Sequence, residues 1–214
     1  MCYNVDTERG KWEMTQQEVF ELLNCYLPDK EVCYDELWQF CRSHGLELAS
    51  GETRYCLIGK NWDFVLKISR FDNVRDDYNA IEFANYENAC ELGIEKIFLK
   101  MWKFGTLDCG LDIYAQIRYS VAHSEIDYGK EKKLRKQTQK VRSCKTFRKS
   151  HEHIYDGYRI SPDWHARAYQ IYGKQFMRKF ERFTRDKRIG DLHNSNVGYL
   201  GKMPIILDFA GYHG

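Results

Sequence analysis

The residue types best suited to chemistry lie near the end of the sequence. Asp191 is followed five positions later by Asn196, and Asp208 stands twelve positions beyond that asparagine, after the apolar run Ile-Ile-Leu. One carboxylate can take the proton of an acceptor hydroxyl, while an amide oxygen and a second carboxylate are suitable ligands for Mg²⁺. The spacing is therefore typical of a phosphoryl-transfer site that uses ATP and Mg²⁺.

A hairpin is expected to hold two of these residues in place. Residues 197–200 and 204–207 have strand character and flank the turn Gly201-Lys202. This hairpin would carry Asn196 at one end and Asp208 at the other.

The middle of the chain is expected to form a sheet. Residues rich in β-formers are separated by Gly-containing turns, and a helix of about residues 76–92 follows the third of these runs. This order predicts an α+β fold with five antiparallel strands. The five strands are expected at residues 46–49, 55–58, 64–68, 97–104 and 111–117.

Helical patterns flank the expected sheet. Thr15 and Glu18 form a capping-box pattern at the start of a helix that stops near Pro28, and a second helix is expected over 32–44. The basic stretch 130–150 is helix-prone. Ser161 before Pro162 predicts the start of one continuous helix that runs to about Thr184.

The composition narrows the class of protein. The 214 residues include 15 Tyr and 12 Phe but only 3 Pro, which favours a packed globular chain over a disordered one. The apolar runs are too short to span a bilayer, and the N-terminus lacks the pattern of a secretory signal. The 8 cysteines include no Cys-x-x-Cys pair, so reduced thiols in a cytoplasm are expected.

Charge is distributed unevenly along the chain. The net charge is +2, but residues 1–50 hold ten acidic and four basic side chains, whereas residues 130–149 hold ten basic side chains and one acidic. A basic block of this kind is either a solvated helix face or a docking surface for an acidic protein or nucleic acid.

The motif Gly-Asp-Leu-His-x-x-Asn, followed by Leu-Asp-Phe, resembles the catalytic motifs of the protein-kinase-like superfamily. It is closer to aminoglycoside- and choline-kinase-type phosphotransferases and to atypical bacterial or viral kinases than to eukaryotic protein kinases. The order of the expected helices and strands resembles that of the superfamily over residues 46–211, but only Lys67 and residues 190–211 match its sequence motifs. It implies a bilobal fold with a reduced, mostly helical C-terminal lobe.

The resemblance also implies roles for individual residues. Asp191 matches the catalytic carboxylate, and Asn196 and Asp208 match the metal ligands. His193 would brace the catalytic loop or contact Asp191, or have a direct catalytic role; the alternative is a structurally bonded histidine. Lys67, within Phe-Val-Leu-Lys-Ile, matches the strand lysine that binds the α- and β-phosphates of ATP.

That lysine requires a glutamate partner on the helix that follows it. Glu82, Glu87 and Glu91 are the candidates. Glu82 is favoured because it lies in the first half of the helix, and Glu87 is the runner-up.

Two further contacts with the nucleotide are expected from the backbone. Amides around Gly51, in a turn with a single glycine, would reach phosphate. The hinge that binds adenine is expected near the fifth strand, at Tyr114, Ala115 and Gln116. The motif Asp208-Phe-Ala departs from Asp-Phe-Gly at its third position, which keeps the metal ligand but loses a permissive backbone position.

The resemblance predicts three regions. Residues 1–45 form a helical extension, 46–120 a kinase-like N-lobe, and 121–214 a truncated C-lobe that ends just after Asp-Phe-Ala-Gly. With no activation segment after Gly211, docking of a peptide substrate in the usual manner is not expected.

Two functions follow as expectations. The first is an ATP- and Mg²⁺-dependent kinase that phosphorylates a hydroxyl group on a partner protein, in a cytoplasm, which would be the host's if the protein is viral. The second is a weak or inactive kinase-like binding protein, such as a phage or mobile-element factor, that uses residues 130–149 to dock an acidic protein or RNA.

Overall fold

Two helices come first in the described part of the chain, α1 (Gln16–Tyr26) and α2 (Tyr34–Ser43). The predicted capping box begins α1, because Thr15 and Glu18 bond each other's backbone amides. The computed structural model describes residues 14–29, 31–70, 77–119, 160, 162–190, 192 and 196–210.

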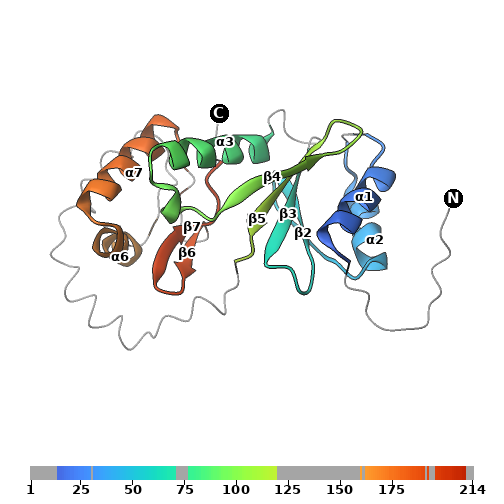
Figure 1. The fold of residues 1–214 in the computed structure, drawn as a ribbon, viewed down its shortest axis with the longest axis horizontal. Helices are drawn as coiled ribbons and strands as arrows, with labels where there is room; N and C mark the ends of the chain where they lie inside the picture. The colour runs from blue at the N-terminus through green and yellow to red at the C-terminus, as the bar shows by residue number, and fades with distance from the viewer. Residues whose placement is uncertain are drawn as a thin grey trace.

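A five-stranded antiparallel sheet forms the centre of the structure, as the sequence predicts (Figure 1). Its strands lie in the order β1-β2-β3-β5-β4, so the third strand occupies the middle. The expected fourth strand begins later than predicted, because residues 95–97 form the short 3₁₀ helix η1 (Glu95–Ile97). The strands are β1 (Glu47–Ser50), β2 (Arg54–Ile58), β3 (Phe64–Ser69), β4 (Met101–Thr106) and β5 (Asp112–Ile117).

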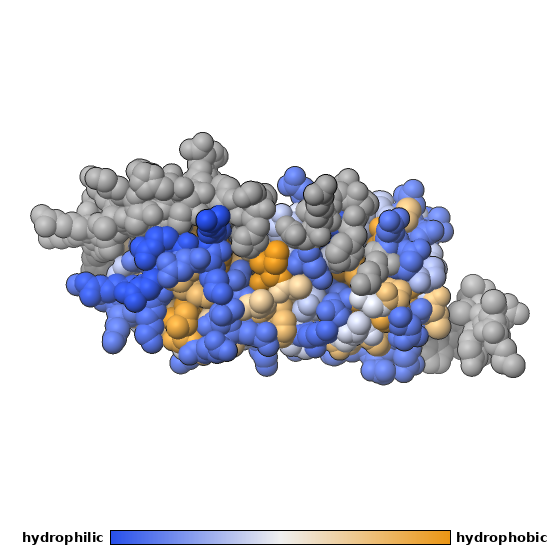
Figure 2. Space-filling view, turned by 90° about the horizontal axis from the view of Figure 1, so that it is seen from above, coloured by the Kyte–Doolittle hydropathy of each residue, from blue (hydrophilic) through white to orange (hydrophobic). Residues whose placement is uncertain are grey.

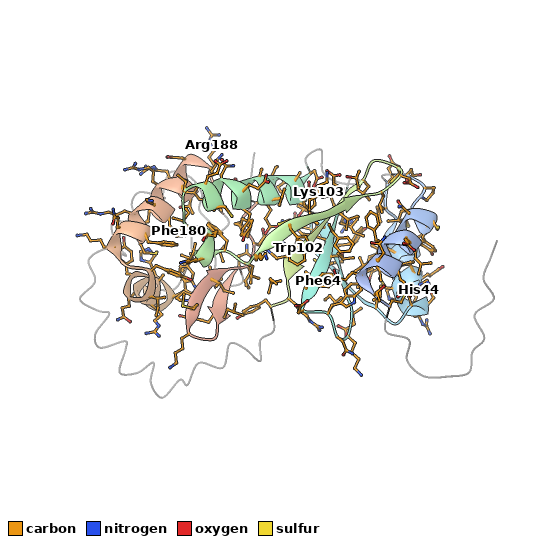
Figure 3. The ribbon with its side chains drawn as sticks, in the orientation of Figure 1. His44, Phe64, Trp102, Lys103, Phe180 and Arg188 are labelled. Atoms are coloured by element: carbon orange, nitrogen blue, oxygen red, sulfur yellow. The ribbon has the colours of Figure 1, made fainter. Side chains whose placement is uncertain are left out.

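The two faces of the sheet differ in character. Because side chains alternate along a strand, Phe64, Leu66 and Ile68 point to one face of β3 and Lys67 points to the other. The apolar face packs against α1 and α2 in one buried cluster, which includes Leu23. Figure 3 labels Phe64, which belongs to this cluster, and Trp102, which packs against it, with ring centroids 5.9 Å apart.

Helix α3 (Tyr78–Glu91) contacts the central strands β3 and β5 as well as β4. Asp77 caps its first turn by accepting hydrogen bonds from the amides of Asn79 and Ala80. Phe83 packs on Tyr114 of β5, with ring centroids 5.4 Å apart. The face of the sheet that carries Lys67 is therefore turned towards this helix.

The predicted continuous helix over residues 161–184 is wrong. The structure has two helices, α6 (Pro162–Tyr172) and α7 (Lys174–Asp186), separated by Gly173. Gly173 takes φ 81° and ψ 161°, a backbone conformation that is essentially restricted to glycine. Strongly hydrophilic residues cover the end of the molecule where α7 lies (Figure 2), while Met177, Phe180 and Phe183 face inward.

The predicted C-terminal hairpin is present as β6 (Val197–Leu200) and β7 (Met203–Ile206). The indole N–H of Trp164 on α6 donates to the carbonyl of Gly198 at 2.9 Å. Ile206 forms a parallel bridge with Phe98, the residue just after η1. These contacts fix the hairpin beside a second buried apolar cluster, which includes residues of α3, α6 and α7.

Some predictions fall outside the described residues. They include the basic helix over 130–150, the boundary between the second and third regions at residues 120 and 121, and the N-cap Ser161. The division into regions 1–45, 46–120 and 121–214 stays a prediction. None of the helices that the structure describes combines the length and the apolar character needed to cross a membrane.

Candidate functional site

Lys67 and Glu82 form an ion pair between the centre of the sheet and α3. The Nζ of Lys67 lies 2.7 Å from Oε2 of Glu82. Lys67 is 5% exposed and Glu82 is fully buried. The other two candidate partners, Glu87 and Glu91, are exposed. Burying an ion pair carries a large desolvation cost, so the pair depends on further polar partners.

Three additional donors satisfy the Glu82 carboxylate. A guanidinium nitrogen of Arg54, at the start of β2, bonds the same Oε2 that Lys67 bonds. The second oxygen, Oε1, accepts from the side-chain amide of Gln116 on β5 and from the backbone N–H of Phe209, each at 3.4 Å. Both oxygens are therefore engaged, as a buried carboxylate requires.

Arg54 connects this cluster to Asp208. Its other guanidinium nitrogen lies 3.3 Å from Oδ1 of Asp208. Burial opposes the charged form of Arg54, but the negative charges of Glu82 and Asp208 outweigh it and raise the pKa of Arg54 above its ordinary value. Residue 54 was not among the predicted site residues. The sequence signal that could have identified Arg54 is its position two residues before Cys56 on β2, because side chains two apart on a strand lie on the same face. Cys56 pairs with Lys67 of β3, so Arg54 and Lys67 share that face of the sheet.

The hairpin and α3 together position Asp208. The carbonyl of Asn196 accepts the amide of Leu207 at 2.8 Å, so Asn196 and Asp208 lie together at the open end of the hairpin. The side-chain amide of Asn85 on α3 donates to the carbonyl of Phe209 at 2.9 Å. The Asp208 side chain is 37% exposed and thus accessible from solvent.

Asp191 and His193 lie outside the described residues, so the structure does not place them. Their neighbours are partly defined. Ile189 and Leu192 are buried, and the amide of Ile189 bonds the carbonyl of Thr184 at 2.8 Å. Arg188, labelled in Figure 3, takes φ 52° in the turn that ends α7 and leads into this segment.

The backbone groups of Gly51 and of residues 114–116, which were expected to contact a nucleotide, already take part in pairing within the protein. The N–H of Gly51 donates to the carbonyl of Arg54 at 2.9 Å, which closes the turn between β1 and β2. Tyr114, Ala115 and Gln116 lie within β5, where they pair with β3 on one side and β4 on the other. The backbone amides and carbonyls of a central strand form hydrogen bonds with both neighbouring strands. A backbone segment that binds adenine would therefore have to begin after Ile117.

The residues present fit a site for a phosphorylated nucleotide and a divalent ion. Lys67 and Arg54 supply positive charge, and Asp208 is a partly exposed oxygen donor beside Asn196. Cys56 lies opposite Lys67, and burial raises the pKa of its thiol, which stays neutral. Among the described residues, no three His, Cys, Asp or Glu side chains gather as a metal site by themselves.

Neither a protein-family model, nor a curated protein, nor a solved structure matches this chain.

Proposed function

We propose that this protein is an ATP- and Mg²⁺-dependent phosphotransferase of the protein-kinase-like type, acting on a hydroxyl group of a partner protein. The observation that carries the proposal is the buried pair of Lys67 and Glu82, which hydrogen bonds join to Asp208 and Phe209. A lysine on the central strand, a glutamate on the following helix and an aspartate after a late hairpin are far apart in sequence. Their convergence is what nucleotide-phosphate binding requires.

Each residue has a defined task in this proposal. Glu82 holds the ammonium of Lys67, which would contact the α- and β-phosphates. Asp208 and Asn196 would hold Mg²⁺, which when bound offsets the negative charge of the phosphates. Asp191 would orient the acceptor hydroxyl and take its proton. The reaction requires a compartment that supplies ATP, which keeps the cytoplasm as the expected location.

A second candidate function is a kinase-like binding protein that transfers no phosphoryl group. One observation favours it, because the guanidinium of Arg54 already bonds the carboxylate expected to bind metal. In that case the biological effect would come from docking an acidic protein or RNA, for which residues 130–149 are the expected surface.

Transfer of labelled phosphate from ATP tests the proposal. Purified protein is incubated with Mg²⁺ and γ-labelled ATP, and label on the protein itself and on added basic or acidic protein acceptors is measured. Lys67→Met is expected to lower the rate at least about 100-fold, as does loss of one fixed donor to a transition-state charge in other enzymes. Asp191→Ala is expected to have an effect of similar size.

Lys103→Met is the matched control. Lys103, labelled in Figure 3, is a lysine of the edge strand β4. It pairs with Asp112 of β5 at 2.8 Å, and its side chain is 43% exposed. Its replacement should leave the rate unchanged. A wild-type protein that transfers no phosphate would reject the enzyme in favour of the second candidate. A Lys67→Met variant as active as Lys103→Met would show that the transfer does not use Lys67, and would reject the proposed site.

A further inference from the structure

We propose that Arg54 is a built-in cation of the nucleotide site, which takes the place of one of two divalent ions, so that the site binds a single divalent ion with each nucleotide. This inference rests on the proposed function. It concerns the metal content of that site, which the roles given to Lys67, Asn196 and Asp208 leave open.

The first support is the fixed position of Arg54. Its side chain is 10% exposed and its two terminal nitrogens bond two different carboxylates, those of Glu82 and Asp208. The backbone is held as well, because the carbonyl of Arg54 accepts the amide of Gly51 and Arg54 pairs with Ser69 across the strands. A planar guanidinium fixed at both nitrogens is oriented before any ligand arrives.

The second support is the balance of charge among the described residues. Lys67 and Arg54 carry two positive charges, and Glu82 and Asp208 carry two negative charges. Lys67 and Arg54 both bond Glu82, and Arg54 also bonds Asp208, so the four charges balance before an anion binds. A lysine, a glutamate and an aspartate without Arg54 would leave a net negative charge that a further cation would have to offset.

The third support is the position of Arg54 at one of the two carboxylate oxygens of Asp208. A guanidinium nitrogen lies 3.3 Å from Oδ1 of Asp208, and a divalent ion bound to that oxygen would lie about 2.1 Å from it. Two cations on one oxygen would be no more than about 5.4 Å apart, a distance at which their repulsion is strong in a partly buried site. Arg54 thus opposes an ion at Oδ1, so a single ion at Asp208 would bind the other carboxylate oxygen, Oδ2.

The number of bound Mn²⁺ ions tests the inference. Protein saturated with the non-hydrolysable ATP analogue AMP-PNP is titrated with MnCl₂, and free Mn²⁺ is followed by electron paramagnetic resonance. The wild type is expected to bind one Mn²⁺ per protein–nucleotide complex. Arg54→Gln is expected to bind a second ion at least about ten times more tightly than the wild type does.

Arg42→Gln is the matched control. The guanidinium of Arg42 lies on α2, 5.2 Å from the centre of the Trp38 ring, and α2 packs on the opposite face of the sheet. This variant should retain the wild-type count of one. Circular dichroism checks the folding of every variant, and Arg54→Met replaces Arg54→Gln if the latter does not fold.

Each result has one meaning. Two Mn²⁺ ions on the wild type, or one ion on a folded Arg54→Gln protein with no gain in affinity for a second, would overturn the role of Arg54 while leaving the proposed function intact. Failure of the wild type to bind AMP-PNP would overturn both. If neither Arg54 variant folds, the wild-type count decides, with one ion in favour and two against.

Discussion

Lys67 of β3 and Glu82 of α3 form a 2.7 Å ion pair inside the protein, and the same carboxylate receives the backbone N–H of Phe209. Phe209 is 127 residues beyond Glu82 in the chain. One buried side chain therefore connects the sheet, the helix that faces it and the segment that carries Asp208. A substitution of Glu82 should therefore affect the sheet, helix α3 and the segment that carries Asp208.

Replacing Glu82 should destabilise the fold as well as the site. Glu82→Gln leaves the charges of Arg54 and Lys67 buried against a neutral amide, and breaking a buried pair in this way costs about 3–5 kcal/mol. Urea unfolding measures the loss. Glu87→Gln, on the exposed side of the same helix, should change stability by no more than about 0.5 kcal/mol. Equal stability of the two variants would show that the buried cluster contributes nothing to the fold.

Asn85 should matter through its hydrogen bonds to the segment after Asp208. Its amide donates to the carbonyls of Phe209 and Ala210, so Asn85→Ala leaves buried acceptors without this donor and should cost about 1–3 kcal/mol. Hydrogen exchange at the Phe209 amide should also become faster. In the control Asn88→Ala, the lost side-chain bond is to Ala84 within α3, and exchange at Phe209 should be unchanged. Unaltered exchange in Asn85→Ala would refute the role of Asn85 in holding this segment.

The break between α6 and α7 predicts that replacing Gly173 destabilises the protein. At φ 81° and ψ 161°, Gly173 has no heavy atom within 4 Å of the place a Cβ would take, so the penalty of Gly173→Ala is one of backbone strain. The cost should be about 1–3 kcal/mol. Thermal unfolding measures it against Gln175→Ala, an exposed helical position that should be nearly neutral. A Gly173→Ala protein as stable as the wild type would mean that the helices join differently.

The buried thiol of Cys41 predicts a stability that falls in alkali. Burial raises the pKa of Cys41 from 9.0 to about 12 in the folded protein. Between these values the unfolded chain has lost the proton that the folded chain keeps, so the free energy of unfolding decreases as pH rises above about 9. Cys41→Ala should show a shallower decrease from about pH 8 to about pH 10 in urea unfolding. The exposed Cys25→Ala should follow the wild type, and identical slopes for all three proteins would contradict the prediction.

Much of the fold could be predicted from local patterns. The β-formers in residues 55–58 and 64–68, bounded by Gly-containing turns, identified strands, and the capping box at Thr15 identified the start of α1. The break at Gly173 was missed because apolar residues continue at helical spacing on both sides of it. A glycine inside such a pattern does not reveal its own φ and ψ.

The site was predictable only in part. Lys67, Glu82 and Asp208 were identified by resemblance, and the structure brings them together. Arg54 was missed because a lone arginine at the start of a strand usually points to solvent, and only tertiary packing buries it between two carboxylates. The position of β5 between β3 and β4 likewise could not be predicted from the sequence. It means that the backbone of Gln116 is already paired with both neighbouring strands.

A crystal structure of the protein with AMP-PNP and Mn²⁺ tests the central claim most directly. The account predicts the triphosphate against Lys67 and an anomalous manganese peak at Asp208. The nucleotide bound elsewhere on the protein, or manganese away from Asp208 with the pair of Lys67 and Glu82 untouched, would contradict it.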